Sequence, residues 1–208
     1  PRVAEQIDVY ALDAVGERLY KARGGKKRLV DPQTVRSYII ENAKKLEQDF
    51  TDHFLFKEWE EVVDPLQLTT WASYRDITRI GRRTRLPVSK REELWKVFTA
   101  VFEELEAKKE ITKAGQFHYL AAQFSSADQH APYEYIIVDE AQDISPPQLK
   151  FLGAMAQNRP NSLFFAGDLG QRIFQAPFSW KQLGVKVRGR SRTLRINYRT
   201  SHQIRQQA

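Results

Sequence analysis

The last third of the chain alternates short apolar runs with polar clusters, and this pattern constrains the fold more than any other feature. Tyr133–Val138 reads YEYIIV and is followed by two acids, which is typical of a buried parallel strand. A helix is expected next, because Ser145 and Gln148 form a capping box with proline at the first helical position. Further strands are expected over 162–166 and 193–196. Strand, helix and strand in this order predict an α/β fold with a parallel sheet.

The first 125 residues follow a helical period instead. Apolar residues over 91–106 recur at intervals of three and four, which predicts a helix with one buried face. Weaker patterns of the same kind cover 11–22, 34–46 and 114–124. The polar segments 21–33 and 81–91 are expected to be loops.

Composition excludes several classes of protein. The chain has no cysteine, so it holds no disulfide scaffold, no thiolate metal site and no cysteine nucleophile. Its four histidines lie far apart in sequence and show no metal-ligand spacing. With 41% hydrophobic residues but only short apolar runs, the chain is expected to be globular, cytoplasmic and not bound to a membrane.

Positive charge gathers at the end of the chain. The formal net charge is +7, and residues 169–208 contain nine Lys and Arg but no acid. Such a stretch suits a polyanion, either a nucleic-acid backbone or a nucleotide. A solvated basic face without a ligand is the alternative.

Polar clusters follow each predicted strand. They begin at Asp139, Gly167 and Asn197. In open α/β sheets ligands bind beyond the carboxyl ends of the strands. An apolar strand followed by two acids, here Asp139 and Glu140, is how P-loop ATPases hold magnesium and activate water. The same acids also suit the start of a helix, so that interpretation stays open.

Three motifs occur in order along this part of the chain: IIVDEAQD from residue 136, GDLGQRIF from 167 and LRINYRT from 194. Together they resemble motifs II, III and IV of superfamily I DNA helicases of the UvrD/Rep/PcrA type. IDVYALDAVGERLY near the start resembles the segment around motif Ia. The resemblance implies part of a RecA-like P-loop ATPase sheet with a largely helical insertion. It divides the chain into 1–24 and 109–208, from the first RecA-like domain, and 25–108, resembling accessory subdomain 1B.

The resemblance also implies roles for single residues in binding and hydrolysing ATP. Asp139 would hold the Mg²⁺ of Mg-ATP, and Glu140 would be the general base. Gln171 would sense the γ-phosphate, Arg199 would act as an arginine finger, and Tyr198 would stack on the adenine. The alternatives are core packing for Tyr198 and a salt bridge for Arg199.

Single-stranded DNA and junctions between single and double strands are the partners that the resemblance implies. Many relatives carry a base-stacking aromatic where this chain has Ala176. Phe178 or Trp180 is expected to supply that platform instead, although burial of either is the alternative. Arg188 and Arg190 are assigned to nucleic-acid binding because they lie in the acid-free stretch.

The phosphate-binding motif G-x-x-x-x-G-K-[ST] does not occur in these 208 residues. The chain is therefore expected to be a fragment that lacks an N-terminal segment and a second RecA-like domain, with negligible ATPase activity alone. A non-catalytic nucleic-acid-binding or protein-interaction module derived from a helicase fold is the second interpretation. A nuclease that binds metal through Asp139, Glu140 and Asp168 is the third.

Overall fold

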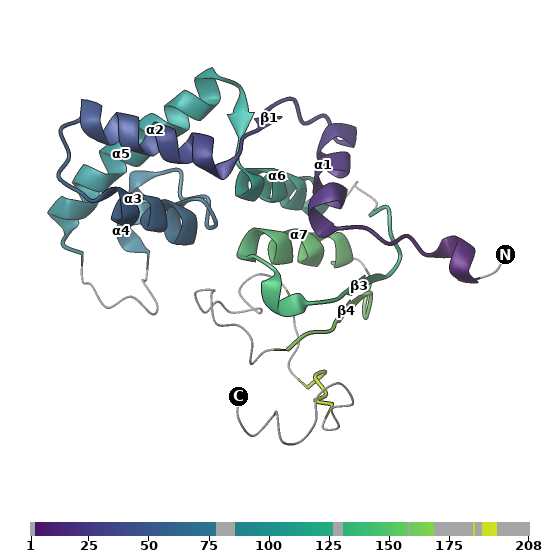
Figure 1. Ribbon diagram of the computed structural model, residues 1–208. Helices are drawn as coiled ribbons and strands as arrows, with labels where there is room; N and C mark the ends of the chain where they lie inside the picture. Colours follow the sequence, from purple (N-terminus) through teal and green to yellow (C-terminus); the bar gives the residue numbers. More distant parts are fainter. Residues whose placement is uncertain are drawn as a thin grey trace, which may run out of the picture.

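The computed structural model describes residues 3–77, 86–126, 131–157, 159–168, 185 and 189–194. These residues are mostly helical, with two small parallel sheets (Figure 1). The helices are α1 (Leu12–Ala22), α2 (Pro32–Lys45), α3 (Asp52–Glu58), α4 (Trp71–Asp76), α5 (Val88–Ala107), α6 (Lys113–Ser125) and α7 (Pro146–Ala156). Shorter helical turns are η1 (Val3–Gln6), η2 (Trp59–Val63) and η3 (Ala141–Asp143). The strands are β1 (Arg28–Leu29), β2 (Glu110–Ile111), β3 (Ile136–Val138) and β4 (Leu163–Phe165).

The helices predicted from periodicity are confirmed as α1, α2, α5 and α6. The prediction of a loop over 21–33 is wrong in part, because this segment contains β1 and the start of α2. Asp31 caps that helix by accepting the backbone N–H of Thr34 at 2.9 Å, with proline next in sequence. The prediction of a loop over 81–91 is wrong for its last residues, because α5 begins at Val88. Residues 81–85 lie outside the described ranges.

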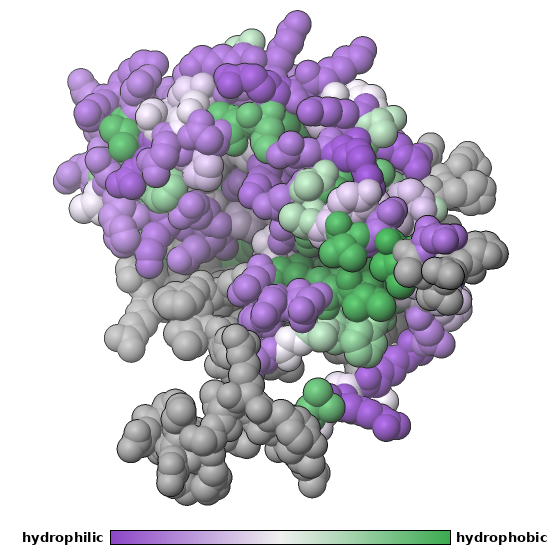
Figure 2. All heavy atoms as spheres, turned by 45° about the vertical axis from the view of Figure 1, so that its right-hand side comes forward, coloured by the Kyte–Doolittle hydropathy of each residue, from purple (hydrophilic) through white to green (hydrophobic). Residues whose placement is uncertain are grey.

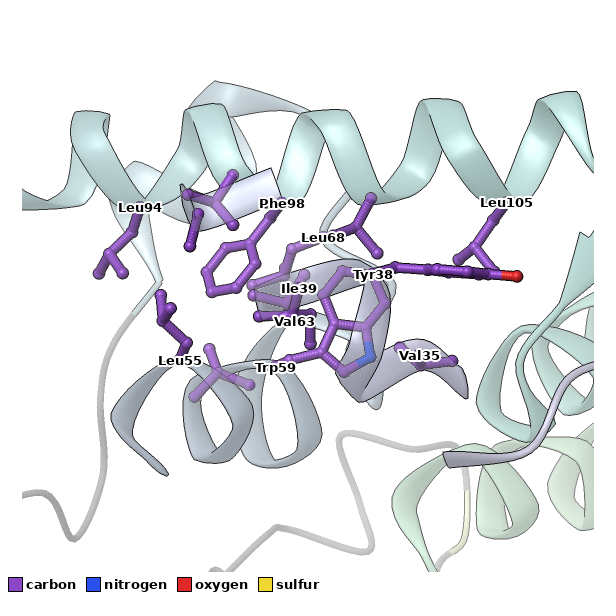
Figure 3. Packing of buried hydrophobic residues seen from close by; sticks show 14 of the residues in the cluster. Val35, Tyr38, Ile39, Leu55, Trp59, Val63, Leu68, Leu94, Phe98 and Leu105 are labelled. Atoms are coloured by element: carbon purple, nitrogen blue, oxygen red, sulfur yellow. The ribbon is translucent and has the colours of Figure 1, made fainter. Parts of the chain in front are cut away.

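Helices α2 to α5, residues 32–107, share one hydrophobic core, and we call them the helical module (Figure 3). Trp59 and Phe98 lie near its centre with their rings 5.8 Å apart, and Tyr74 contacts Phe98 at 5.9 Å. Helix α5 contributes the stripe that its sequence predicts: Leu94, Val97, Phe98, Val101 and Leu105 are all buried. The module therefore has its own apolar core.

The module is joined to the rest of the chain at a short parallel ribbon. Strand β1 pairs with β2, with Arg28 opposite Glu110. The ribbon thus fixes the points at which the chain enters and leaves the module. Glu110 is only 3% exposed, and it is paired with the Arg28 guanidinium and the Tyr38 hydroxyl. These partners compensate for burying the carboxylate.

A second core lies between α1, α6, α7 and the β3–β4 sheet. The Phe151 ring lies 5.4 Å from that of Phe117 and 5.9 Å from that of Phe124, so α7 and α6 are packed face to face. Helix α7 begins where the capping box predicts. The backbone N–H of Ser145 donates to Oε1 of Gln148 at 2.9 Å.

Strands β3 and β4 are parallel neighbours, as the sequence predicts. The prediction that β3 is buried on both faces is wrong, because Ile137 and its partner Phe164 are 76% and 62% exposed. On the face drawn in Figure 2 the largest group of apolar side chains lies to the right of the centre, and smaller apolar groups lie above it. Only one face of the sheet is covered by the described helices. Thr193 and Leu194 of the expected third strand are not in a strand, and residues 195–196 lie outside the described part.

A polar contact connects the helical module to the second core. Asp64 accepts hydrogen bonds from Thr112 Oγ1 at 2.6 Å and from Gln67 Nε2 at 3.0 Å. One residue on, the Pro65 carbonyl lies 2.8 Å from Nε2 of His118. Burial raises the pKa of Asp64 to about 7, and burial together with nearby Lys150 lowers the pKa of His118. Both side chains are therefore favoured in their neutral forms.

Replacing Asp64 with Asn should stabilise the protein at pH 8 and change its stability little near pH 4. The pKa of the Asp64 carboxyl is about 7 in the folded protein, against an ordinary value of 3.8. As pH rises through this interval, the carboxyl ionises more readily in the unfolded chain than in the folded protein, so the free energy of unfolding falls. Asn keeps the oxygen that accepts from Thr112 and Gln67 but carries no charge. Three pKa units correspond to roughly 4 kcal/mol, which is an upper bound on the gain in unfolding free energy.

Urea unfolding at both pH values measures this gain. Asp31→Asn is the matched control, because the Asp31 carboxyl is exposed and its hydrogen bonds to Thr34 lower its pKa. This control should show no gain at pH 8. An equal effect of Asp64→Asn at pH 4 and pH 8 would contradict the prediction.

Candidate functional site

The carboxyl ends of β3 and β4 lie side by side and position the candidate site. In the parallel register Val138 is opposite Phe165, so Asp139 and Glu140 emerge beside the residues that follow β4. The backbone continues this pairing. The Ala166 N–H donates to the Val138 carbonyl at 2.8 Å, and the Ala141 N–H donates to the Ala166 carbonyl at 2.8 Å. The turn after β3 is therefore held against the end of β4.

Asp139 presents an exposed carboxylate at this edge. Its Oδ1 accepts the backbone N–H of Glu140 at 2.9 Å, and no described residue gives Oδ2 a hydrogen bond. A hard cation such as Mg²⁺ is commonly held by one or two carboxylates, with substrate phosphates and water completing the shell. The donor set at this strand end fits that arrangement. Mg²⁺ bound there would screen the charge of the phosphates.

Glu140 adopts a left-handed backbone conformation, with φ 50° and ψ 44°. For a residue with a side chain this conformation costs about 1–2 kcal/mol, so the surrounding contacts must stabilise it. It turns the chain from β3 into η3. The exposed carboxylate of Glu140 accepts a hydrogen bond from Gln142 Nε2 at 2.5 Å.

Gln142 is a site residue that the sequence reasoning missed. It is 5% exposed, and its side-chain oxygen accepts the backbone N–H of Asp168 at 3.0 Å. Gly167 leaves space for it, because a Cβ there would lie 2.5 Å from Gln142 Oε1 and 2.7 Å from the Ala141 nitrogen. The only signal in the sequence is a glutamine two residues after Glu140. Its partner is 26 residues away, so local pattern alone does not reveal the bond.

Arg190 is the one other predicted site residue within the described ranges, and it does not lie at this edge. Nη1 of Arg190 donates to Asn161 Oδ1 at 2.9 Å, and Asn161 precedes β4. Arg190 therefore lies toward the opposite end of that strand from Asp139. The remaining predicted site residues lie outside the described part of the chain: Gln171, Phe178, Trp180, Arg188, Tyr198 and Arg199.

The nuclease interpretation gains no geometric support. It requires Asp139, Glu140 and Asp168 to share a metal ion. Within the described ranges, no three His, Asp or Glu side chains lie close enough together to do so. Asp168 instead contributes its backbone N–H to the bond with Gln142.

A model of the UvrD/REP helicase N-terminal domain matches residues 5–180. The chain belongs to the UvrD/REP helicase family. The predicted resemblance to this family is thereby confirmed over a range that includes the IIVDEAQD and GDLGQRIF motifs. The described structure, mostly helical with small parallel sheets, is consistent with part of a UvrD helicase domain.

The family match includes Asp139, Glu140 and Gln142, and it ends at Trp180. Tyr198 and Arg199 lie beyond it. No curated protein and no solved structure matches the chain. Among the helices of the described residues, none has the length and apolar character needed to cross a membrane.

Proposed function

We propose that the chain is part of an ATP-dependent DNA helicase or translocase, which couples ATP hydrolysis to movement along single-stranded DNA and to unwinding of duplexes. One observation carries the proposal. A member of the UvrD/REP helicase family places adjacent acids, Asp139 and Glu140, at the carboxyl end of a parallel strand, beside the end of β4. This is the place where ligands bind in open α/β sheets.

In this proposal Asp139 holds the Mg²⁺ of Mg-ATP, and Glu140 is the general base that activates the attacking water. The exposure of both carboxylates supports these roles, since each must reach ligand or water. Gln171, Tyr198 and Arg199 keep the roles that the resemblance implies. Phosphoryl transfer needs a metal, an oriented water and a positive charge, and these residues supply the groups for all three.

We also propose that β3 and β4 belong to the sheet of a RecA-like domain. The domain division is 1–24 and 109–208 for that domain and 25–108 for a helical insertion. Two separate hydrophobic clusters support the division, one within the helical module and one between α1, α6, α7 and the sheet. The β1–β2 ribbon supports the boundaries, because it pairs the two ends of the insertion.

The non-catalytic module remains the second candidate. It is favoured by the lack of G-x-x-x-x-G-K-[ST] within these 208 residues. The two candidates are distinguished by the sequence and the ATPase activity of the protein that the gene encodes. A phosphate-binding loop ahead of Pro1, together with ATP hydrolysis stimulated by single-stranded DNA, supports the motor. Binding of DNA without hydrolysis by the encoded protein supports the module.

Replacing Trp180 with Ala should weaken binding of a single-stranded oligonucleotide. Stacking of one base on an aromatic ring is worth about 1–3 kcal/mol, so the Kd should rise roughly 5- to 150-fold. Fluorescence anisotropy at fixed salt measures this change. Trp71→Ala is the control, since Trp71 packs against Tyr74 in the helical module. Unchanged affinity of the Trp180 variant would contradict the stacking role.

A further inference from the structure

The amide of Gln142 connects the two strand ends of the candidate site. Its Nε2 donates to the Glu140 carboxylate at 2.5 Å, and its Oε1 accepts the Asp168 N–H at 3.0 Å. The opposite orientation of the amide would set Oε1 against a carboxylate and the NH₂ group against an N–H donor. The two partners therefore allow only one orientation. Because the side chain is buried, losing either bond leaves a polar group unsatisfied.

The surroundings of Gln142 leave it little freedom. Gly167 lies against Oε1 with no room for a Cβ. Ala141, the residue before Gln142, is itself bonded through its N–H to the Ala166 carbonyl. A displacement of the backbone after β4 would thus act on Gln142, and through it on the carboxylate of Glu140.

We propose that Gln142 is a positioning residue for ATP hydrolysis, which holds the Glu140 carboxylate and makes its orientation depend on the backbone at Asp168. The inference rests on the proposed role of Glu140 as general base. Asp168 lies three residues before Gln171, the position expected to contact the γ-phosphate. One side chain therefore couples that segment to the base. Orientation of a catalytic group within a fraction of an ångström has large effects on rate.

The bridge itself is tested by NMR on the 208-residue chain. Glu140→Gln should shift the Asp168 amide resonance, because the change at Glu140 reaches that N–H through the Gln142 amide. In the Gln142→Leu background the same Glu140→Gln change should shift the resonance far less. Gln148→Leu is the matched control, because Gln148 also uses both ends of its amide, with Ser145 and Asp13. An Asp168 shift of equal size on Glu140→Gln in the Gln142→Leu and wild-type backgrounds would overturn the inference.

The effect on catalysis is tested by ATP hydrolysis in the encoded protein. Gln142→Leu should lower kcat about 10- to 100-fold and leave KM for ATP within about two-fold, since part of the contribution of a general base is lost. Gln142→Glu keeps an acceptor for the Asp168 N–H but cannot donate to Glu140, so it should also lower kcat. A Gln142 variant with wild-type kcat would overturn the positioning role.

A double variant separates this inference from the proposed function. In the Glu140→Gln background, Gln142→Leu should lower kcat no further, because the two residues act through one group. Additive losses would overturn the inference. Wild-type kcat in Glu140→Gln alone would instead overturn the general-base role, and the NMR shift of the Asp168 amide would still decide whether the bridge exists.

Discussion

Glu140→Gln should lower ATP hydrolysis by the encoded protein about 10²- to 10⁴-fold, the usual contribution of a general base. Gln has the size and shape of Glu but cannot take a proton from water. The amide still has an oxygen that can accept from Gln142, so binding of Mg-ATP should change little. The measurement is kcat at saturating single-stranded DNA and saturating Mg-ATP, together with KM for ATP.

Glu134→Gln is the matched control for this prediction. Glu134 lies before β3, in the YEYIIV segment, whereas Glu140 follows that strand; Glu134 is exposed and paired with Arg159 at 3.4 Å. It should keep wild-type kcat. The 208-residue chain alone is expected to show negligible hydrolysis. DNA-stimulated turnover by that chain, abolished by Glu140→Gln, would show that it needs no further segment.

Phe98→Ala should destabilise the helical module by about 3–5 kcal/mol, which is typical of removing a buried aromatic side chain. Phe98 is 0% exposed and packs between the rings of Trp59 and Tyr74. Truncation removes apolar contacts on both sides and leaves a cavity that the neighbouring rings cannot close without moving. The expected result is a large fall in the urea midpoint.

Tryptophan fluorescence reports on this unfolding, because Trp59, Trp71 and Trp95 lie in the module. Phe102→Ala is the control. Phe102 lies one turn further along α5, contacts Trp59 at 5.0 Å and is only partly buried, so its loss should cost less. Equal destabilisation by the two variants would show that Phe98 is not the centre of this core.

Local sequence patterns predicted the elements that depend on local interactions. The apolar stripe along α5 and the capping box of α7 each depend on residues only three or four positions apart in sequence, and both predictions are confirmed. The β1–β2 ribbon was missed because each strand has two residues and its partner is about 80 residues away. A strand of two residues is too short to show the alternation of apolar and polar residues by which strands are recognised in a sequence.

The candidate site was predicted only in part, because some of its contacts are local in sequence and others join distant residues. Adjacent acids after an apolar run identified Asp139 and Glu140, and the family match supports the motif that contains them. Gln142 was not predicted, because its role follows from the Asp168 backbone and from the space left by Gly167. Arg190 was assigned to DNA binding by charge, and that role stays a prediction; its bond to Asn161 places it toward the opposite end of β4 from Asp139. Charge along the sequence does not fix a position in space.

The sequence by itself determined the family, the helical first part and the acidic pair at the end of a strand. These depend on residue types at short spacings, which the chain carries whatever its tertiary contacts. Only the tertiary structure decided that β3 has one open face, that Asp64 is enclosed with a raised pKa, and that Gln142 joins Glu140 to Asp168. The last two properties arise because folding buries together groups that are far apart in the chain, such as Asp64 with Thr112 and Gln142 with Asp168. The open face arises because the described helices pack against only one side of the sheet.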